Sequence, residues 1–268
     1  FQLIGNINNS GQPSFSLAFS LFKNSHWNVL SNFSPLRYWK MIEIGNSAIL
    51  TRAALKIDEH ILHYITGIPY LHELLSIYIH PVSEKGILSE LQLNKLEKFI
   101  TASYQKEGNT LPVIIGTDKK ERNLAAKKIA EKLGYGLFSI QLNNLPQTAI
   151  DLNNLSRIWN REAILNNYML LADCSEMQYA EKQVQQAVSD FISKITIPVI
   201  ICTNQWVPDT MLQVQEFEIP ALTTDEQVHL WNKILSKYSI NGNGIAGRLV
   251  SQFNLTGNAI QRATTTFY

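Results

Sequence analysis

The pattern of hydrophobic and polar residues changes near residue 110, from mainly helical spacing to an alternation of two patterns. Beyond that point, short apolar runs alternate with segments in which apolar residues recur every three or four positions. The apolar runs predict strands at residues 112–115, 137–141, 168–172 and 198–202. The periodic segments predict helices at residues 121–133, 151–166 and 178–194. Strands that alternate with helices are typical of a parallel sheet, so this region predicts an α/β fold.

Helical patterns flank this region on both sides. After a short strand at residues 217–220, the pattern predicts helices at 224–238, at 244–253 and from about Gly257 onward. Before it come a predicted helix from Ser34-Pro35 to Gly45, a short strand at Ile49-Leu50 and a helix capped by Asp58. Short helices separated by brief strands favour a small winged-helix-like α+β module.

The chain therefore divides into four expected parts. They are a winged-helix-like module at residues 1–83, a helical connector at 84–109, an α/β subdomain at 110–216 and a helical lid at 217–268.

Composition narrows the class of protein. Hydrophobic residues make up 45% of the 268 residues and charged residues 17%, as expected of a chain that forms a core. The net charge of +1 gives no overall attraction to nucleic acid or to a membrane surface. Cys174 and Cys202 lie in apolar runs, which favours buried free thiols and a reducing, cytoplasmic compartment. Because the sequence starts at Phe1 rather than Met, we expect it to be a fragment of a longer protein.

A candidate phosphate loop follows the first predicted strand. The pattern G-x-x-x-x-G-K-[ST] can begin at Gly116, and its last three positions then fall on Glu121, Arg122 and Asn123. Two interpretations stay open from this stretch: a decayed phosphate loop, or an ordinary strand–turn–helix. The candidate nucleotide-binding residues are Gly116, Thr117, Asp118, Lys119, Lys120, Glu121, Arg122 and Asn123.

Each replacement in this pattern weakens phosphate binding for a physical reason. A glutamate obstructs the approach of backbone N–H groups to phosphate, both by its bulk and by its charge. Arg122 is bulkier than lysine and forked, and Asn123 lacks the hydroxyl that seats Mg²⁺. We therefore expect this stretch not to support ATP hydrolysis.

Two further predicted strands end in polar residues. The run from Tyr168 ends at Asp173, the position at which a P-loop ATPase holds Mg²⁺, but Cys174 follows instead of a carboxylate that could polarise water. The run from Pro198 ends at Asn204, which could orient a water molecule. Polar residues also end strands in many other α/β proteins, and that plainer interpretation stays open.

His60 and His63 have a spacing that could place two metal ligands on one face of a helix. No cysteine or acidic partner stands at a standard zinc spacing, so we expect two surface or rim histidines and no metal site.

Taken in order, these segments resemble the AAA-type ATPases. IPALTTDEQVHLWNKIL resembles the entry to the AAA lid, and FNLTGNAIQRA resembles its sensor-2 helix, with Arg262 as the nearest arginine. FSPLRYWKMIEIG, LTRAALKIDEHILHYITG and YLHELLSIYIHPV resemble the winged-helix region that precedes the AAA modules in one bacterial family. Some members of that family accompany contractile injection systems. The resemblance covers residues 13–264.

The resemblance implies a degenerate first AAA module with a P-loop NTPase-like parallel sheet and a helical lid. It further implies an intact second module beyond Tyr268, Walker B-like residues Asp173 and Cys174, and sensor-like residues Asn204 and Arg262. We expect no cofactor in this fragment, ATP and Mg²⁺ for the full-length protein, and protein partners or a homo-oligomeric ring rather than nucleic acid or a membrane.

Two alternatives remain. One is a weak ATPase that uses Lys119, Lys120 or Arg122 as the phosphate cation. The other is a DNA-binding winged-helix regulator that uses the basic run Lys119, Lys120, Arg122, Lys127 and Lys128.

Overall fold

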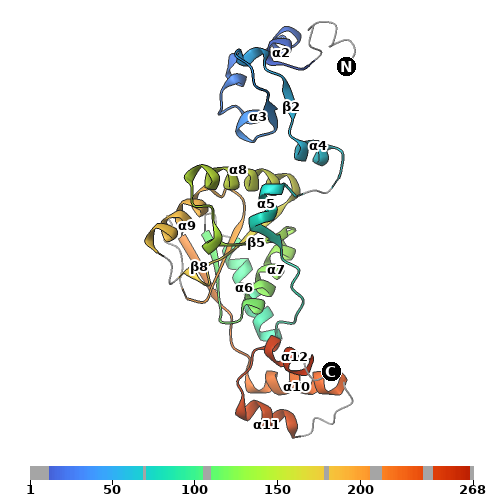
Figure 1. Cartoon of the computed structure of the whole chain (residues 1–268). Helices are drawn as coiled ribbons and strands as arrows, with labels where there is room; N and C mark the ends of the chain where they lie inside the picture. Colours follow the sequence, from blue (N-terminus) through green and yellow to red (C-terminus); the bar gives the residue numbers. More distant parts are fainter. Residues whose placement is uncertain are drawn as a thin grey trace. The chain divides into compact units, whose positions relative to one another are not determined.

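The computed structural model describes residues 12–68, 71–104, 110–177, 181–205, 213–237 and 244–265 (Figure 1). The chain forms two compact units. The first comprises Phe1–Ile77 together with Arg157–Glu162, and the second comprises Tyr78–Ser156 and Ala163–Tyr268. Six residues of a later helix therefore belong to the first unit.

The first unit combines short helices with a small antiparallel sheet. Strands β1 (Ile42–Ile44) and β2 (Leu55–Ile57) form this two-stranded sheet. Its helical elements are α2 (Phe15–Leu21), η1 (Trp27–Leu30), α3 (Pro35–Tyr38), η2 (Leu50–Arg52), α4 (Glu59–Ile65) and α5 (Glu73–Tyr78). The winged-helix interpretation of this unit stays a prediction.

Local backbone geometry explains where this unit departs from the sequence pattern. The helix predicted as far as Gly45 ends at Tyr38, because Lys40 takes a left-handed φ of 49° and the chain then extends into β1. The strand predicted at Ile49-Leu50 is also wrong, since Leu50–Arg52 is a 3-10 turn. The cap of α4 is confirmed, because the Asp58 carboxylate accepts a hydrogen bond from Ile61 N.

The second unit is built on a six-stranded sheet of order β3-β5-β6-β7-β4-β8. Only β3 (Ile79–Pro81) runs antiparallel to its neighbour, so the mainly parallel sheet is confirmed. The remaining strands are β4 (Thr110–Ile115), β5 (Gly136–Gln141), β6 (Tyr168–Asp173), β7 (Val199–Thr203) and β8 (Gln213–Glu218).

The helices of the sheet region agree with the predicted ones within a few residues. Residues 178–180 of one predicted helix, and residue 238 of another, lie outside the described residues. The helical elements are α6 (Glu90–Tyr104), α7 (Lys119–Leu133), η3 (Leu142–Asn144), α8 (Ala149–Asn166) and α9 (Lys182–Lys194).

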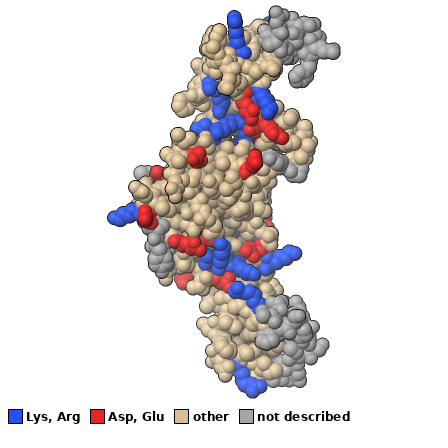
Figure 2. Space-filling view, in the orientation of Figure 1, with Lys and Arg blue, Asp and Glu red and all other residues tan. Residues whose placement is uncertain are grey.

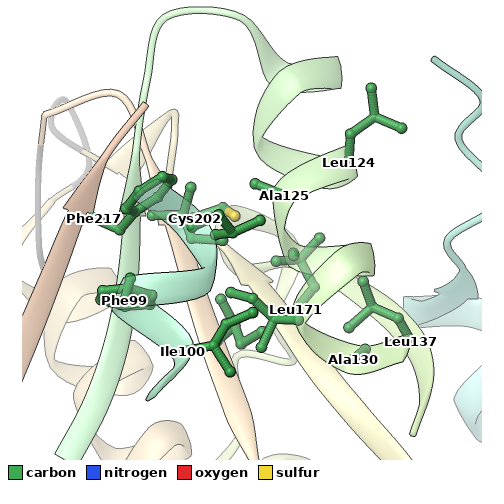
Figure 3. Close-up of a cluster of buried hydrophobic side chains, with 14 of the residues drawn as sticks. Phe99, Ile100, Leu124, Ala125, Ala130, Leu137, Leu171, Cys202 and Phe217 are labelled. Carbon is green, nitrogen blue, oxygen red and sulfur yellow. The ribbon is translucent and has the colours of Figure 1, made fainter. Parts of the chain in front are cut away.

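A buried apolar cluster joins α6 and α7 to the sheet (Figure 3). Phe99 and Ile100 come from α6, Leu124 and Ala125 from α7, and Phe217 from β8. The period of three to four residues along α7 places its small and aliphatic side chains on the face that contacts the sheet. This packing fixes the amino-terminal end of α7 at the edge of the sheet where β4 ends.

Among the described residues, the carboxy-terminal subdomain contains the helices α10 (Thr224–Lys237), α11 (Ile245–Gln252) and α12 (Gly257–Thr265). Trp231, Ile234 and Ile260 are among the residues of its separate apolar core. A reciprocal cap starts α10, in which Thr223 N donates to Glu226 Oε2 over 2.8 Å and Glu226 N donates to Thr223 Oγ1 over 3.3 Å. Across the described part of the chain, no helix is both long and apolar enough to cross a bilayer.

Candidate nucleotide site

The predicted site residues follow strands that end at the same edge of the sheet. Strand β4 lies between β7 and β8, so the chain reverses its direction of travel through the sheet beside β4. Ligands of open α/β sheets bind at such a switch point, outside the carboxyl ends of the strands. Gly116 follows β4 there, Asp173 ends β6 and Asn204 follows β7.

Helix α7 begins earlier than the phosphate-loop register requires. Its cap is Asp118, so the connection from β4 is only Gly116, Thr117 and Asp118, and Lys119–Asn123 are helical. The helix predicted at residues 121–133 thus begins two residues earlier, at Lys119. Asp118 Oδ1 accepts hydrogen bonds from Lys120 N over 2.7 Å and from Glu121 N over 3.3 Å. The N–H groups that would bind an anion at this helix terminus therefore bind a carboxylate of the chain itself.

Arg122 is buried and spans the space between two strand ends. Its guanidinium donates hydrogen bonds to the Gly116 carbonyl oxygen and to Ser175 Oγ. Ser175 Oγ in turn donates to Asp173 Oδ1. The forked side chain thus joins the turn after β4 to the turn after β6 through two separate nitrogens.

Both carboxylate oxygens of Asp173 have partners. Oδ1 accepts from Ser175 N over 3.0 Å, and Oδ2 lies 3.0 Å from Gln141 Nε2 and 3.1 Å from Lys119 Nζ. Burial raises the pKa of Asp173, but the hydrogen bonds from Ser175 and Gln141 and the charge of Lys119 outweigh it and hold that pKa below its ordinary value. Asp173 is therefore an ionised group that is held by side chains.

Cys174 directly follows Asp173, where the sequence pattern predicts that a catalytic carboxylate has been replaced. Its side chain is fully buried, and its backbone N–H donates to the Cys202 carbonyl oxygen over 2.7 Å. Burial, with a smaller contribution from the charge of Asp173, raises the pKa of the Cys174 thiol far above its ordinary value. The thiol stays protonated at neutral pH and cannot act as a general base.

Glu121 points to the helical subdomain rather than into the candidate phosphate site. It is 7% exposed, and its Oε1 accepts a hydrogen bond from Gly257 N, at the start of α12, over 3.1 Å. Burial and the nearby charge of Asp118 raise the pKa of Glu121, against the opposing effect of the Gly257 N–H.

Asp118 also faces the helical subdomain. Its Oδ2 accepts from Thr256 Oγ1 over 2.9 Å and lies 3.8 Å from a guanidinium nitrogen of Arg262. Arg262 is thus near the candidate loop, where it lies beside a carboxylate, and its sensor-like role stays a prediction.

The remaining predicted residues do not converge on this site. Asn123 Nδ2 donates to Glu84 Oε1 over 3.2 Å and so faces the connector. Thr117 and Lys120 are exposed. Asn204 Oδ1 is buried and has no hydrogen-bond partner within the described ranges.

Three residues of the site are missing from the sequence prediction: Gln141, Ser175 and Thr256. Gln141 ends a predicted strand and Ser175 follows Asp173 by two positions, but neither spacing belongs to the phosphate-loop pattern. Thr256 precedes the glycine that starts the last predicted helix, which is a recognisable capping signal.

The histidine interpretation needs one correction, in the first unit. His60 is not at the surface: it is 4% exposed and contacts the Glu162 carboxylate through Nε2. The sequence pattern missed this partner because it lies far away along the chain. His63 Nε2 lies 3.6 Å from Glu59 Oε1. In the described ranges, no group of three or more His, Cys, Asp or Glu side chains is arranged to hold a metal ion.

The fold and the position of these residues define a class. A mostly parallel sheet with a strand–turn–helix at its switch point, an acid-ended strand nearby and a following helical subdomain is the architecture of an AAA-type P-loop ATPase. Residues 223–267 match the family described as the contractile injection system ATPase helical domain. Over these residues, α10 to α12, the chain is similar to the helical domain of contractile injection system ATPases.

Other comparisons are more distant. No curated protein matches the sequence. A solved structure described as replication initiator DnaA bound to AMPPCP and single-stranded DNA is 10% identical, with a TM-score of 0.44, over 70% of this chain and 64% of that chain. The chain thus spans less than two thirds of the length of that DnaA chain. A structure described as the structural basis for katanin self-assembly is 12% identical, with a TM-score of 0.47, over 74% of this chain and 77% of that chain.

Proposed function

We propose that this chain is a non-catalytic AAA module that serves ring assembly or partner recruitment in an ATPase of a contractile injection system. ATP turnover would then belong to a competent module elsewhere in the assembly. One observation carries the proposal: the groups that would meet phosphate and Mg²⁺ already bond one another. Asp118 caps the helix terminus, and Asp173 is bound by Lys119, Gln141 and Ser175.

The charge of Asp118 has a substantial expected effect on nucleotide binding. At an effective dielectric constant near 20, two like unit charges about 4 Å apart repel each other by roughly 4 kcal/mol. That energy corresponds to about a thousandfold loss of affinity. Lys119 and Arg122 do not offset the repulsion freely, because a phosphate would have to displace their present carboxylate, carbonyl and hydroxyl partners.

The surface of the first unit supports a role in partner recruitment. Its exposed aromatic residues include Phe22 at 67%, Trp27 at 70% and Phe33 at 86% exposure. They line an apolar groove or lie beside it, together with Phe15 and Leu36. Exposed apolar groups of this kind mark protein-binding surfaces.

The charge distribution gives the DNA-binding alternative less support. Helix α4 of the first unit contains no lysine or arginine. On the face shown in Figure 2, positive and negative side chains lie near one another instead of forming a surface of one sign. A nucleic-acid site is expected to present clustered basic residues.

Calorimetry with Mg·ATP tests the proposal directly. We expect no binding heat at about 100 μM nucleotide, where a site with micromolar Kd would be nearly saturated. A coupled ATPase assay should give the same background rate for the chain and for its Asp173→Ala variant. Micromolar binding would contradict the proposed loss of nucleotide binding. Turnover that disappears in Asp173→Ala would show that the module is catalytic.

A further inference from the structure

The acidic residues of the degenerate loop contact the first turn of α12. Gly257 N donates to Glu121 Oε1 over 3.1 Å, and Thr256 Oγ1 donates to Asp118 Oδ2 over 2.9 Å. Arg262, one turn further along α12, lies 3.8 Å from the same Asp118 oxygen. A carboxylate near a helix amino terminus satisfies orphan N–H donors and interacts favourably with the helix dipole.

Asp118 links two helices with a single carboxylate. Its Oδ1 binds the first turn of α7, and its Oδ2 binds the residue that precedes α12. The two elements are 138 positions apart in sequence, so this contact ties the α/β core to the helical subdomain. A bound anion could occupy the same place only by displacing this carboxylate.

Close packing and a second hydrogen bond support the same junction. A Cβ at Gly86 would lie 2.9 Å from Asn258 Oδ1 of α12 and 2.5 Å from Leu124 Cδ1 of α7, so a larger residue there would require these side chains to shift. Buried Gln92 donates through Nε2 to the Pro220 carbonyl oxygen over 2.9 Å, in the segment that leads into α10.

We infer that Asp118, Glu121, Thr256, Gly257 and Arg262 form a latch that holds the helical subdomain in one position on the α/β core without nucleotide. A subdomain that closes on a ligand moves when the ligand binds or leaves. Here, side chains of the α/β core take the place of a ligand in holding the helical subdomain, and these side chains are always present. The latched module therefore presents the same surface to neighbouring subunits at all times. This property is additional to the proposed lack of catalysis.

Two variants of one residue separate the latch from general stability. Glu121→Ala removes the acceptor of the Gly257 N–H, whereas Glu121→Gln keeps an Oε1 acceptor. Hydrogen exchange in the absence of nucleotide should show the amide of Gly257 exchanging at least about tenfold faster in Glu121→Ala, equivalent to about 1.4 kcal/mol. Glu121→Gln should exchange at about the rate of the unmodified chain.

Spin labels at Lys95→Cys in α6 and Asn232→Cys in α10 report the position of the subdomain itself. Both sites are exposed, whereas Cys174 and Cys202 are buried and will not take up label. The distance distribution between the labels should be narrow in the unmodified background and in Glu121→Gln. It should broaden in Glu121→Ala. An unchanged distribution and unchanged exchange in Glu121→Ala would overturn the latch.

A variant at Thr256, on the other side of the junction, tests the latch without any substitution in α7, so a misfolded α7 cannot account for its result. Thr256→Val removes the hydroxyl that donates to Asp118, and Thr256→Ser retains it. Broadening in Thr256→Val but not in Thr256→Ser supports the latch, and equal behaviour of the two contradicts it. Since no nucleotide is present, neither result depends on whether the chain binds ATP.

Discussion

The buried carboxyl group of Glu121 gains a hydrogen bond, but its ionised form is disfavoured by its surroundings. It accepts one backbone hydrogen bond from the helical subdomain, yet it lies near the charge of Asp118 and is almost inaccessible to water. Burial and this like charge favour its protonated form and raise its pKa. Between the unfolded pKa and this raised pKa the folded state binds more protons, so stability falls as the pH rises through that window.

This linkage predicts a pH-dependent gain of stability in Glu121→Gln. The amide imitates the protonated acid and keeps the acceptor for Gly257 N, so the variant should be more stable than the unmodified chain at pH 8. The difference should disappear below about pH 4, near the pKa of an unperturbed glutamate, because Glu121 is then neutral in both states. Urea unfolding at the two pH values measures the difference.

Glu97→Gln is the matched control, because Glu97 is an exposed carboxylate paired with Lys132 at 3.4 Å. It should change the unfolding free energy by less than about 0.5 kcal/mol at either pH. A Glu121→Gln variant that is less stable than the unmodified chain at pH 8 would contradict the argument.

At the scale of a single element, the sequence of α7 explains why the turn between β4 and α7 is only three residues long. Lys119, Lys120, Glu121 and Arg122 are all good helix formers, and no second glycine interrupts them. Asp118 supplies a strong cap just before them. The helix therefore extends back to Asp118, and the residues aligned with the signature positions lie inside it.

Restoring the signature alone should not restore binding. In Glu121→Gly with Arg122→Lys and Asn123→Thr, Asp118 still occupies the helix terminus, so Mg·ATP should bind weakly. Adding Asp118→Gly frees the N–H groups and removes one negative charge, and calorimetry should then show binding at least about tenfold tighter. Hydrolysis should stay absent, because Cys174 supplies no base. Equal affinity of the triple and quadruple variants would show that Asp118 is not the obstruction.

At the scale of the whole molecule, the first unit depends on a segment from much later in the chain. Buried Arg161 lies 3.4 Å from Asp58 Oδ1, 2.9 Å from Glu162 Oε1 and 2.7 Å from the Lys40 carbonyl oxygen. Glu162 in turn contacts His60. A buried charge that loses its partner is strongly destabilising, so this unit is incomplete without residues 157–162.

Removing Arg161 should therefore cost far more than removing a neighbouring arginine. Arg161→Ala leaves the buried carboxylate of Glu162 and the partly buried one of Asp58 without their cation and should lower the unfolding free energy by roughly 3–5 kcal/mol. Arg157→Ala is the matched control, since Arg157 stacks over the Tyr38 ring at 4.6 Å and such a contact contributes about 0.5–1 kcal/mol. Urea denaturation compares the two, and similar losses would contradict the argument.

The sequence pattern predicted the elements of the sheet region well and their contacts poorly. From residue 110 onward, the strands appear in the sequence as short continuous apolar runs, and the helices as apolar residues that recur every three or four positions. Strand β3 is only three residues long, which is too short to show a periodic pattern. The helix before β1 ends because Lys40 has a positive φ, and the pattern of apolar residues does not reveal that backbone conformation. The partners of Asp118 and Glu121 are set by the position of α12, which no local spacing encodes.

The threefold bonding of Asp118 has an evolutionary consequence. Its carboxylate simultaneously caps α7, accepts from Thr256 and lies beside Arg262. A substitution of Asp118 that opens the helix terminus to phosphate removes this helix cap, at about 1 kcal/mol, before any nucleotide can compensate. Further losses follow from the abandoned partners. Loss of Asp118 is therefore expected to be selected against unless another substitution restores the lost stability.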